Sequence, residues 1–216
     1  MACGGGCCAA SDVFGSKVAE RDLKRYRRRG PGSITRLLLQ ELRRSPLKGV
    51  QLLDIGGGIG VIPAELADST SAATLVEASS AYLEVARREV GPRYASFARF
   101  VLGDFVQIAD TVDPADVVTL DRVVCCYPDF EALLGLAAAR TRRLLAFTYP
   151  RDRWYVRAFF ACGNLFFRIK GSQFRAFIHP PQRMREVIES AGLAHVTRFG
   201  TFVWIGDVYC HRGGTN

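Results

Sequence analysis

The chain has 216 residues, of which 49% are hydrophobic and 23% are charged, and its formal net charge is +8 at pH 7. This composition is typical of one globular domain that is large enough to bury a core. It excludes a simple membrane span, because no apolar run reaches the length of about 18 residues that a span needs.

The first ten residues, MACGGGCCAA, form a head rich in cysteine and glycine. The head has neither the basic start nor the apolar centre of a signal peptide, so we expect a cytoplasmic protein with free thiols. Seven scattered cysteines do not suggest a disulfide scaffold. The head has no histidine and no C-x-x-C spacing, so we expect flexibility there and no metal site.

Residues 11–48 predict one or two basic amphipathic helices, interrupted at RGPGS (29–33). Much of the positive charge lies in RDLKRYRRRG (21–30). A basic patch of this kind attracts nucleic acid, an anionic membrane or an acidic small molecule, and it also occurs on ordinary solvated helix faces.

From residue 50 onward, strand-like and helix-like segments alternate. Buried strands are predicted at 51–56, 73–78, 97–105, 116–124 and 143–150, with helices at 63–69, 81–90 and 130–141 between them. This alternation predicts right-handed βαβ units and a parallel sheet that is covered on both faces. A helix at 180–193 then precedes two strands within 195–211, which are joined too tightly to be parallel.

Residues 154–171 form an apolar insertion after the fifth predicted strand. On a helical wheel Arg157, Asn164 and Arg168 share one side, and aromatic residues occupy most of the rest. The insertion fits a large apolar ligand, a core helix or a dimer face.

The stretch QLLDIGGGIGVIP (51–63) carries the pattern Asp-x-Gly-x-Gly-x-Gly, from Asp54 through Gly60. It lacks the lysine and hydroxyl residues that complete a phosphate-binding Walker loop. It also lacks the last glycine of the dinucleotide fingerprint, because Val61 stands at that position.

The pattern resembles motif I of the class I S-adenosylmethionine-dependent methyltransferases. The resemblance covers about residues 50–210. It implies an α/β, Rossmann-like fold with a mostly parallel seven-stranded sheet of order 3-2-1-4-5-7-6, an antiparallel C-terminal hairpin, and helices on both faces. It also implies S-adenosylmethionine as cofactor and S-adenosylhomocysteine as product.

Further acidic residues follow the predicted strands in the order that this superfamily shows. By resemblance, Glu77 would bind the ribose hydroxyls, Asp104 the adenine amino group, and Asp121 would border the transferable methyl group. Ligands bind at the carboxyl ends of the strands in such sheets. The resemblance places the cofactor on Asp54, Gly56, Gly57, Gly58, Gly60, Glu77, Ala78, Asp104, Phe105, Asp121 and Arg122.

The segment LDRVVCCYPD (120–129) is similar to the motif IV region of the magnesium-protoporphyrin O-methyltransferases, in which an Asp is followed by His-Tyr-Pro. Here Cys126 replaces that histidine, and the spacing from Asp121 is one residue longer. FRAFIHPP (174–181) is also similar to a segment of that family. The resemblance implies a small or medium organic acceptor, with an apolar carboxylate as one candidate.

The catalytic candidates are His179, as a general base, with Tyr127 and Asp121. Arginine binds carboxylates in a bidentate manner, so Arg151 and Arg153 are candidates for the acceptor site, together with Trp154 and Tyr127. The alternatives are a backbone-bonded histidine at the start of a helix, and arginines in surface ion pairs.

We expect no metal, and either a monomer or a homodimer. The N-terminal helical region is expected to close over the cofactor as a lid. Two other functions stay open at this point. One is an RNA methyltransferase guided by its basic N-terminal region (Arg25, Arg27, Arg28 and Arg29), and the other is a non-catalytic cofactor-binding partner protein.

Overall fold

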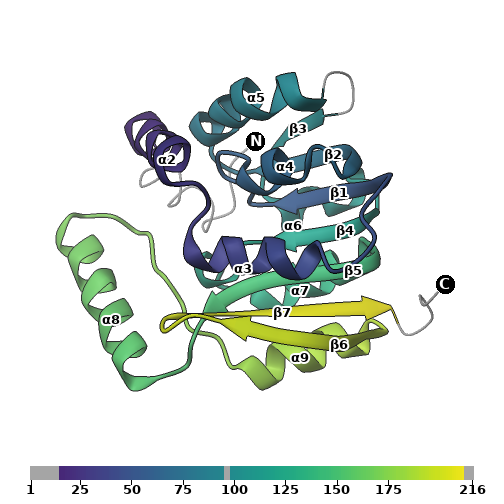
Figure 1. The fold of residues 1–216 in the computed structure, drawn as a ribbon. Coiled ribbons are helices and arrows are strands. Elements are labelled where there is room, and N and C mark those ends of the chain that lie inside the picture. Colours follow the sequence, from purple (N-terminus) through teal and green to yellow (C-terminus); the bar gives the residue numbers. More distant parts are fainter. Residues whose placement is uncertain (1–14, 95–97, 212–216) are drawn as a thin grey trace.

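The computed structural model describes residues 15–94 and 98–211 of the chain. These residues form a seven-stranded sheet with helices on both faces (Figure 1). The cysteine-rich head lies outside the described residues.

The sheet has the order β3-β2-β1-β4-β5-β7-β6, which confirms the predicted topology. Its first five strands pair in parallel, and β7 runs antiparallel to both β5 and β6. The strands are β1 (Val50–Ile55), β2 (Thr70–Glu77), β3 (Ala98–Leu102), β4 (Ala115–Leu120), β5 (Thr141–Pro150), β6 (Leu193–Gly200) and β7 (Trp204–His211).

The core lies on both faces of the sheet because the central strands are apolar at consecutive positions. In β1, Leu53 packs into the cluster formed with α7 (Phe130–Ala139) and α9 (Pro181–Ser190). Its neighbour Leu52 packs into the cluster on the opposite face, formed with α3 (Ser33–Leu42) and α4 (Val61–Leu66). In Figure 1, α3 lies in front of the strands and α7 behind them.

The N-terminal region forms two helices, α2 (Ser16–Arg29) and α3. Gly30 separates them and adopts a left-handed φ of 70°, which glycine accepts without steric cost. The α2 helix packs through Ala19 and Leu23 against Tyr82 of α5 (Ser80–Tyr94). An ion pair between Arg27 and Glu89, with a separation of 2.6 Å, adds a second link between these helices.

Two predicted strands are longer than the observed ones. The third prediction ran to Phe105, but Asp104 accepts a hydrogen bond from the Val106 N–H and begins a short helix, α6 (Phe105–Ile108). The fourth ran to residue 124, but β4 ends at Leu120, and Arg122 has a φ of 60° that breaks the extended backbone. Short 3₁₀ turns follow at Ala109–Thr111 and Val124–Cys126.

The apolar insertion is a helix, α8 (Trp154–Ile169), which lies beside the carboxyl end of β5 and away from the two core layers (Figure 1). Val156 is its one fully buried residue. Within the described ranges, no helix is long and apolar enough to cross a bilayer.

The C-terminal hairpin contains a buried carboxylate, Asp207, whose side chain is 2% exposed. It accepts hydrogen bonds from Arg198 at 2.8 Å, from Tyr149 at 2.6 Å, and lies 2.9 Å from His195. Burial opposes its charge, but these hydrogen bonds outweigh burial and lower the pKa of Asp207. The cluster links β5, β6 and β7.

Replacing Asp207 with Ala should lower the free energy of unfolding by about 3 kcal/mol, because the change leaves Arg198 and Tyr149 without their buried partner. Urea denaturation measures this loss. The control is Asp113→Ala, since the Asp113 side chain is 88% exposed and its pair with Arg99 lies on the surface. Equal stability losses in the two variants would contradict the role of the cluster.

Candidate functional site

Acidic residues end three neighbouring strands at the same edge of the sheet: Asp54 on β1, Glu77 on β2, and Asp121 directly after β4. Two adjoining cavities lie at this edge, with volumes of about 450 and 410 Å³. They share Gly56, Gly58, Tyr82, Asp121 and Arg122, so they form one elongated cleft.

Asp54 lies at the bottom of the first cavity and is 1% exposed. Its Oδ1 accepts a hydrogen bond of 2.7 Å from the Thr119 hydroxyl, while its Oδ2 has no hydrogen-bond partner among the described residues. Burial raises the pKa of Asp54 to about 8; the Thr119 bond opposes this shift, and the nearby carboxylates of Asp121 and Glu77 add to it. A cationic ligand group would supply the hydrogen-bond donor and the positive charge that this carboxyl lacks.

The glycine loop lies beside Asp54. A Cβ built on Gly57 would fall 2.5 Å from Asp54 Oδ2, so any side chain there would displace the buried acid. Gly58 differs, because it has a φ of 57° and its nearest neighbour would be the Tyr82 ring at 3.6 Å. Gly58 therefore faces open space in the cleft. Gly60 does not line either cavity.

Glu77 connects this loop to the end of β2. Its two carboxylate oxygens accept backbone N–H groups, one from Gly58 at 2.9 Å and one from Ser79 at 2.8 Å. Burial raises the pKa of Glu77, and these backbone bonds oppose the shift. Glu77 and Ala78 both line the second cavity, at the position where a ribose was expected.

The second cavity continues past Asp104 and Phe105. The Tyr127 hydroxyl lies 3.1 and 3.0 Å from the two carboxylate oxygens of Asp104, so it donates to this carboxylate. The aromatic side chains of Phe160, Phe174 and Trp204, which come from three separate segments, also line this cavity.

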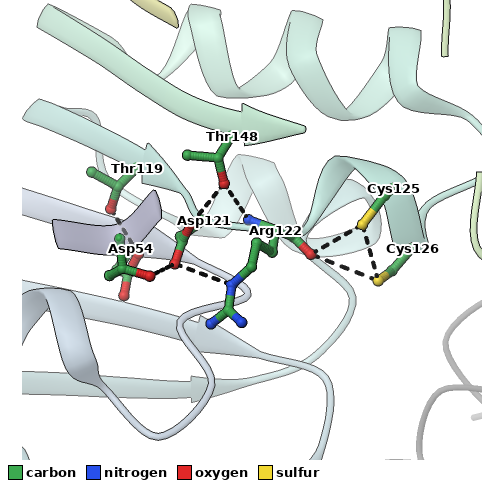
Figure 2. Close-up of polar contacts among 8 residues, drawn as sticks. Asp54, Thr119, Asp121, Arg122, Cys125, Cys126 and Thr148 are labelled. Carbon is green, nitrogen blue, oxygen red and sulfur yellow. Dashed lines mark hydrogen bonds and ion pairs between the residues drawn. The ribbon is translucent and has the colours of Figure 1, made fainter. Parts of the chain in front are cut away.

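Asp121 lies between the two cavities and is held from both sides (Figure 2). The Thr35 hydroxyl of α3 donates to Oδ2 at 2.6 Å, and the Thr148 hydroxyl of β5 donates to Oδ1 at 2.6 Å. Thr148 also accepts the N–H of Arg122 at 2.8 Å. These bonds hold Arg122 in its left-handed backbone conformation, which is uncommon for a residue with a side chain.

Two adjacent thiols line the second cavity next to this turn (Figure 2). Their sulfur atoms are 3.7 Å apart, and both thiols approach the Arg122 carbonyl oxygen, Cys125 at 3.4 Å and Cys126 at 3.7 Å. The hydrogen bond between them raises the pKa of Cys125 and lowers that of Cys126. No grouping of three or more His, Cys, Asp or Glu side chains suited to a metal occurs within residues 15–94 and 98–211.

The α2 helix covers the first cavity, and Asp22, Arg25, Tyr26 and Arg29 line it. The helix is fastened by hydrogen bonds from Tyr26 to Glu65 at 2.9 Å and from Tyr82 to Asp22 at 2.7 Å. That this helix closes over a bound cofactor as a lid stays a prediction.

Comparisons with known proteins agree with this geometry. The methyltransferase small domain family matches residues 28–131 of the chain. The magnesium protoporphyrin IX methyltransferase of Synechocystis PCC 6803 with bound S-adenosylhomocysteine has a similar fold, with a TM-score of 0.73 at 16% identity over 95% of this chain and 99% of that one. The N-methyltransferase NodS of Bradyrhizobium japonicum WM9 has a TM-score of 0.64 at 16% identity, over 91% and 98% of the two chains.

A TehB-like methyltransferase of Corynebacterium glutamicum is also similar, with a TM-score of 0.65 at 15% identity over 91% of this chain and 98% of that one. No curated protein matches the chain in sequence. The chain therefore has the Rossmann-like fold of the class I S-adenosylmethionine-dependent methyltransferases.

The residues that the sequence predicted to bind the cofactor line the cleft, except Gly60, whereas His179 does not line it. The Nε2 atom of His179 lies 3.1 Å from the Val124 carbonyl oxygen and 3.0 Å from that of Tyr127, so the N–H is shared between these two acceptors. The ring packs against Phe130, and burial lowers the pKa of His179. This placement suits a residue that positions Tyr127.

The predicted acceptor residues after β5 also lie outside the lining of both cavities. Arg151 donates to the Thr201 carbonyl oxygen at 2.6 Å and so braces the β6–β7 turn. Arg153 is exposed, and Trp154 is 80% exposed. Among the predicted acceptor residues, Tyr127 alone lines the cleft.

Sequence reasoning missed Thr35, Phe174 and Trp204, which line the cleft, and Thr148, which donates to Asp121. Thr35 and Thr148 stand 86 and 27 positions from the carboxylate that they bind. A single threonine in a helix or strand carries no pattern that marks it as a carboxylate partner. Only the topology, which brings α3 and β5 to the end of β4, makes them neighbours.

The raised pKa of Asp54 predicts a pH dependence of stability. In the unfolded chain an aspartate has a pKa of about 3.9, whereas here it titrates near 8, so between these values the folded state binds the extra proton. The free energy of unfolding should therefore fall with rising pH, by up to about 1.4 kcal/mol per unit for this group. Denaturation of the wild type and of Asp54→Asn at several pH values isolates the effect.

The Asn variant lacks this titration, so its stability relative to the wild type should rise between pH 5.5 and 8. Parallel curves for the two proteins would show that Asp54 is already ionised in the folded state.

Proposed function

We propose that this chain transfers the methyl group of S-adenosylmethionine to a small or medium organic acceptor. The observation that carries the proposal is the Oδ2 atom of Asp54, which is buried and unpaired among the described residues and lies beside the open position at Gly58. An ammonium group such as that of the methionine moiety fits a buried carboxyl of this kind, because it supplies both charge and donors.

The rest of the cleft suits the remaining parts of the same molecule. Arg25 and Arg29 line the first cavity, where a methionine carboxylate would be expected next to an ammonium group on Asp54. Glu77 lies where the ribose hydroxyls would bind. Asp104 and Phe105 lie where the adenine would bind, one with acceptor oxygens and the other with an apolar ring edge.

The bound cofactor supplies a methyl group on a sulfonium centre, which transfers by in-line displacement. The chain contributes position and desolvation. Asp121, which lines both cavities, accepts hydrogen bonds from two threonine hydroxyl groups, and its carboxylate is therefore held in a fixed orientation in the cleft. The aromatic residues Phe160 and Trp204 exclude water from the second cavity.

The acceptor class follows from what the second cavity contains. No histidine lines either of the two cavities, and the Tyr127 hydroxyl is engaged with Asp104. Acceptors that carry their own charge, such as carboxylates and thiolates, do not need a general base. The aromatic lining favours an apolar body, and Arg122 can face an acceptor carboxylate.

An RNA acceptor is less well supported. Arg25 and Arg27, two of the four arginines on which that alternative depends, form ion pairs with Asp22 and Glu89. One of these acids lies on α2 itself and the other on α5, and both compensate arginine charge that would otherwise be free to bind phosphates.

Gly58→Arg should lower the affinity for S-adenosylhomocysteine at least a hundredfold, because the new side chain would occupy the open space of the cleft. The left-handed backbone at this position costs about 1–2 kcal/mol of stability for a residue with a side chain. Calorimetry measures the affinity, and urea denaturation measures the stability.

The matched control is Gly49→Arg. Gly49 has a φ of 79°, open surroundings and no place in the cleft, so this variant carries the same added charge and similar strain. Its affinity should equal that of the wild type. Unchanged affinity in Gly58→Arg would overturn the assignment of the loop.

Methyl transfer itself is tested with a panel of apolar carboxylates, thiols, phenols and RNA, by following the formation of S-adenosylhomocysteine. We expect turnover with an apolar carboxylate or thiol. Phe160→Ala should raise KM for that acceptor about tenfold and leave the affinity for S-adenosylhomocysteine unchanged, since Phe160 lines only the second cavity. Turnover with RNA alone, or cofactor binding without any turnover, would refute the proposed acceptor class.

A further inference from the structure

The outer face of α8 exposes a continuous set of large apolar side chains. Their exposed fractions lie between 57% and 80%, although the rest of the domain buries most side chains of this size. We name this set the α8 apolar face, and it consists of Trp154, Phe159, Leu165, Phe166 and Ile169.

The two sides of the α8 helix differ: the outer side faces solvent, and the inner side packs on the domain. At 100° per residue, the α8 apolar face spans an arc of about 140°. The opposite side holds the helix on the domain: Asn164 exchanges two hydrogen bonds with the backbone of Ala176, and Phe167 packs on Phe174 at 5.3 Å. The outer face is therefore exposed while the helix is anchored through its inner side.

The tip of the C-terminal hairpin extends this surface. Phe202 is 75% exposed and stacks on Tyr155 at a centroid distance of 4.4 Å. Tyr155 in turn contacts the Trp154 ring at 5.9 Å. Aromatic side chains thus continue from the helix to the β6–β7 turn.

Among the described residues, the cations at the edges of this face are not compensated, although Arg157, Arg183 and Arg185 further away pair with acidic residues. Residues 153–185 contain no aspartate or glutamate and seven arginine and lysine residues. Arg168 and Lys170 stand at the two edges of the α8 apolar face, and neither forms an ion pair within the described part of the chain. Lys170 lies 5.7 Å from the centre of the Phe166 ring.

We propose that the α8 apolar face binds the surface of an anionic phospholipid bilayer. Aromatic and aliphatic side chains that lie parallel to the membrane plane enter the interface, and flanking cations attract acidic headgroups. With 16 residues, α8 lies on the membrane surface and does not span it. This inference does not depend on the proposed methyl transfer.

Charge complementarity favours a bilayer over a second copy of the chain. A symmetric dimer through this face would bring the cations at its edges, Arg168 and Lys170, into the interface of both copies, with no acid between residues 153 and 185 to compensate them. An anionic bilayer supplies that negative charge. Phe160, on the inner side of the same helix, lines the second cavity, so docking would place this cavity next to the membrane.

The test is flotation of the full chain with phosphatidylcholine vesicles, with and without about 30% phosphatidylglycerol. We expect strong binding to the anionic vesicles and much weaker binding to the neutral ones. The paired change Phe159→Ser with Phe166→Ser should weaken binding at least tenfold. Its control is Leu102→Ser with Val196→Ser, since each of these side chains is 54% exposed on a strand outside α8.

The charge contribution is tested by Arg168→Gln with Lys170→Gln, which should weaken binding to anionic vesicles about 25-fold, or about fivefold per cation. Arg142→Gln with Arg143→Gln removes the same net charge at the opposite end of β5 and should have little effect. Absence of binding to anionic vesicles would overturn the proposal, as would equal binding by all four double variants. Gel filtration of the Phe variant completes the test: a dimer that this change dissociates, without vesicle binding, would assign the face to a second copy.

Discussion

The structure depends on how it accommodates carboxylates that are buried together at one edge of the sheet. Asp54, Glu77 and Asp121 lie at the ends of adjacent strands, and the charges of Glu77 and Asp121 add to the cost of burying Asp54. Each acid is stabilised differently. Glu77 accepts two backbone N–H groups, and Asp121 accepts two threonine hydroxyls. Asp54 has one hydroxyl and a pKa near 8, so this position is left in need of a cation.

Hydrogen bonds to the acidic side chains of Asp121 and Asp22 attach the covering helices to the rest of the domain. Thr35 brings the start of α3 onto Asp121, and the hydrogen bond between Tyr82 and Asp22 holds α2 over the glycine loop. The N-terminal helices are therefore part of the cleft and share its polar contacts.

Much of the fold could be predicted from the sequence because its signals are local. Apolar runs that end in an acid or in glycine predicted the strands along the chain, and the tight C-terminal pair predicted the hairpin, whereas the order of the strands in the sheet was implied by the resemblance to the class I methyltransferases. The glycine loop and Glu77 were found because their spacing follows one βαβ unit. The left-handed backbone of Arg122 could not be predicted, because no sequence pattern before it indicates this conformation. It depends on a hydrogen bond to Thr148, which lies on β5.

The acceptor side could not be predicted in the same way. Arg151 and Trp154 follow β5 closely in the sequence. However, Arg151 donates a hydrogen bond to the β6–β7 turn, and Trp154 is exposed to solvent. The residues that do line the second cavity, such as Phe174 and Trp204, meet only through tertiary packing. For His179, the carbonyl oxygens of Val124 and Tyr127 engage Nε2, which fits the backbone-bonded alternative that the sequence left open.

The most direct test of the central claim is calorimetric titration of the full chain with S-adenosylhomocysteine at pH 7, in two buffers with different ionisation enthalpies. The account predicts one-to-one binding with release of a proton, because an ammonium group beside Asp54 would lower the raised pKa of this carboxyl. Titration with NADH should give no binding. Binding of NADH in place of S-adenosylhomocysteine, or binding of neither, would contradict the account.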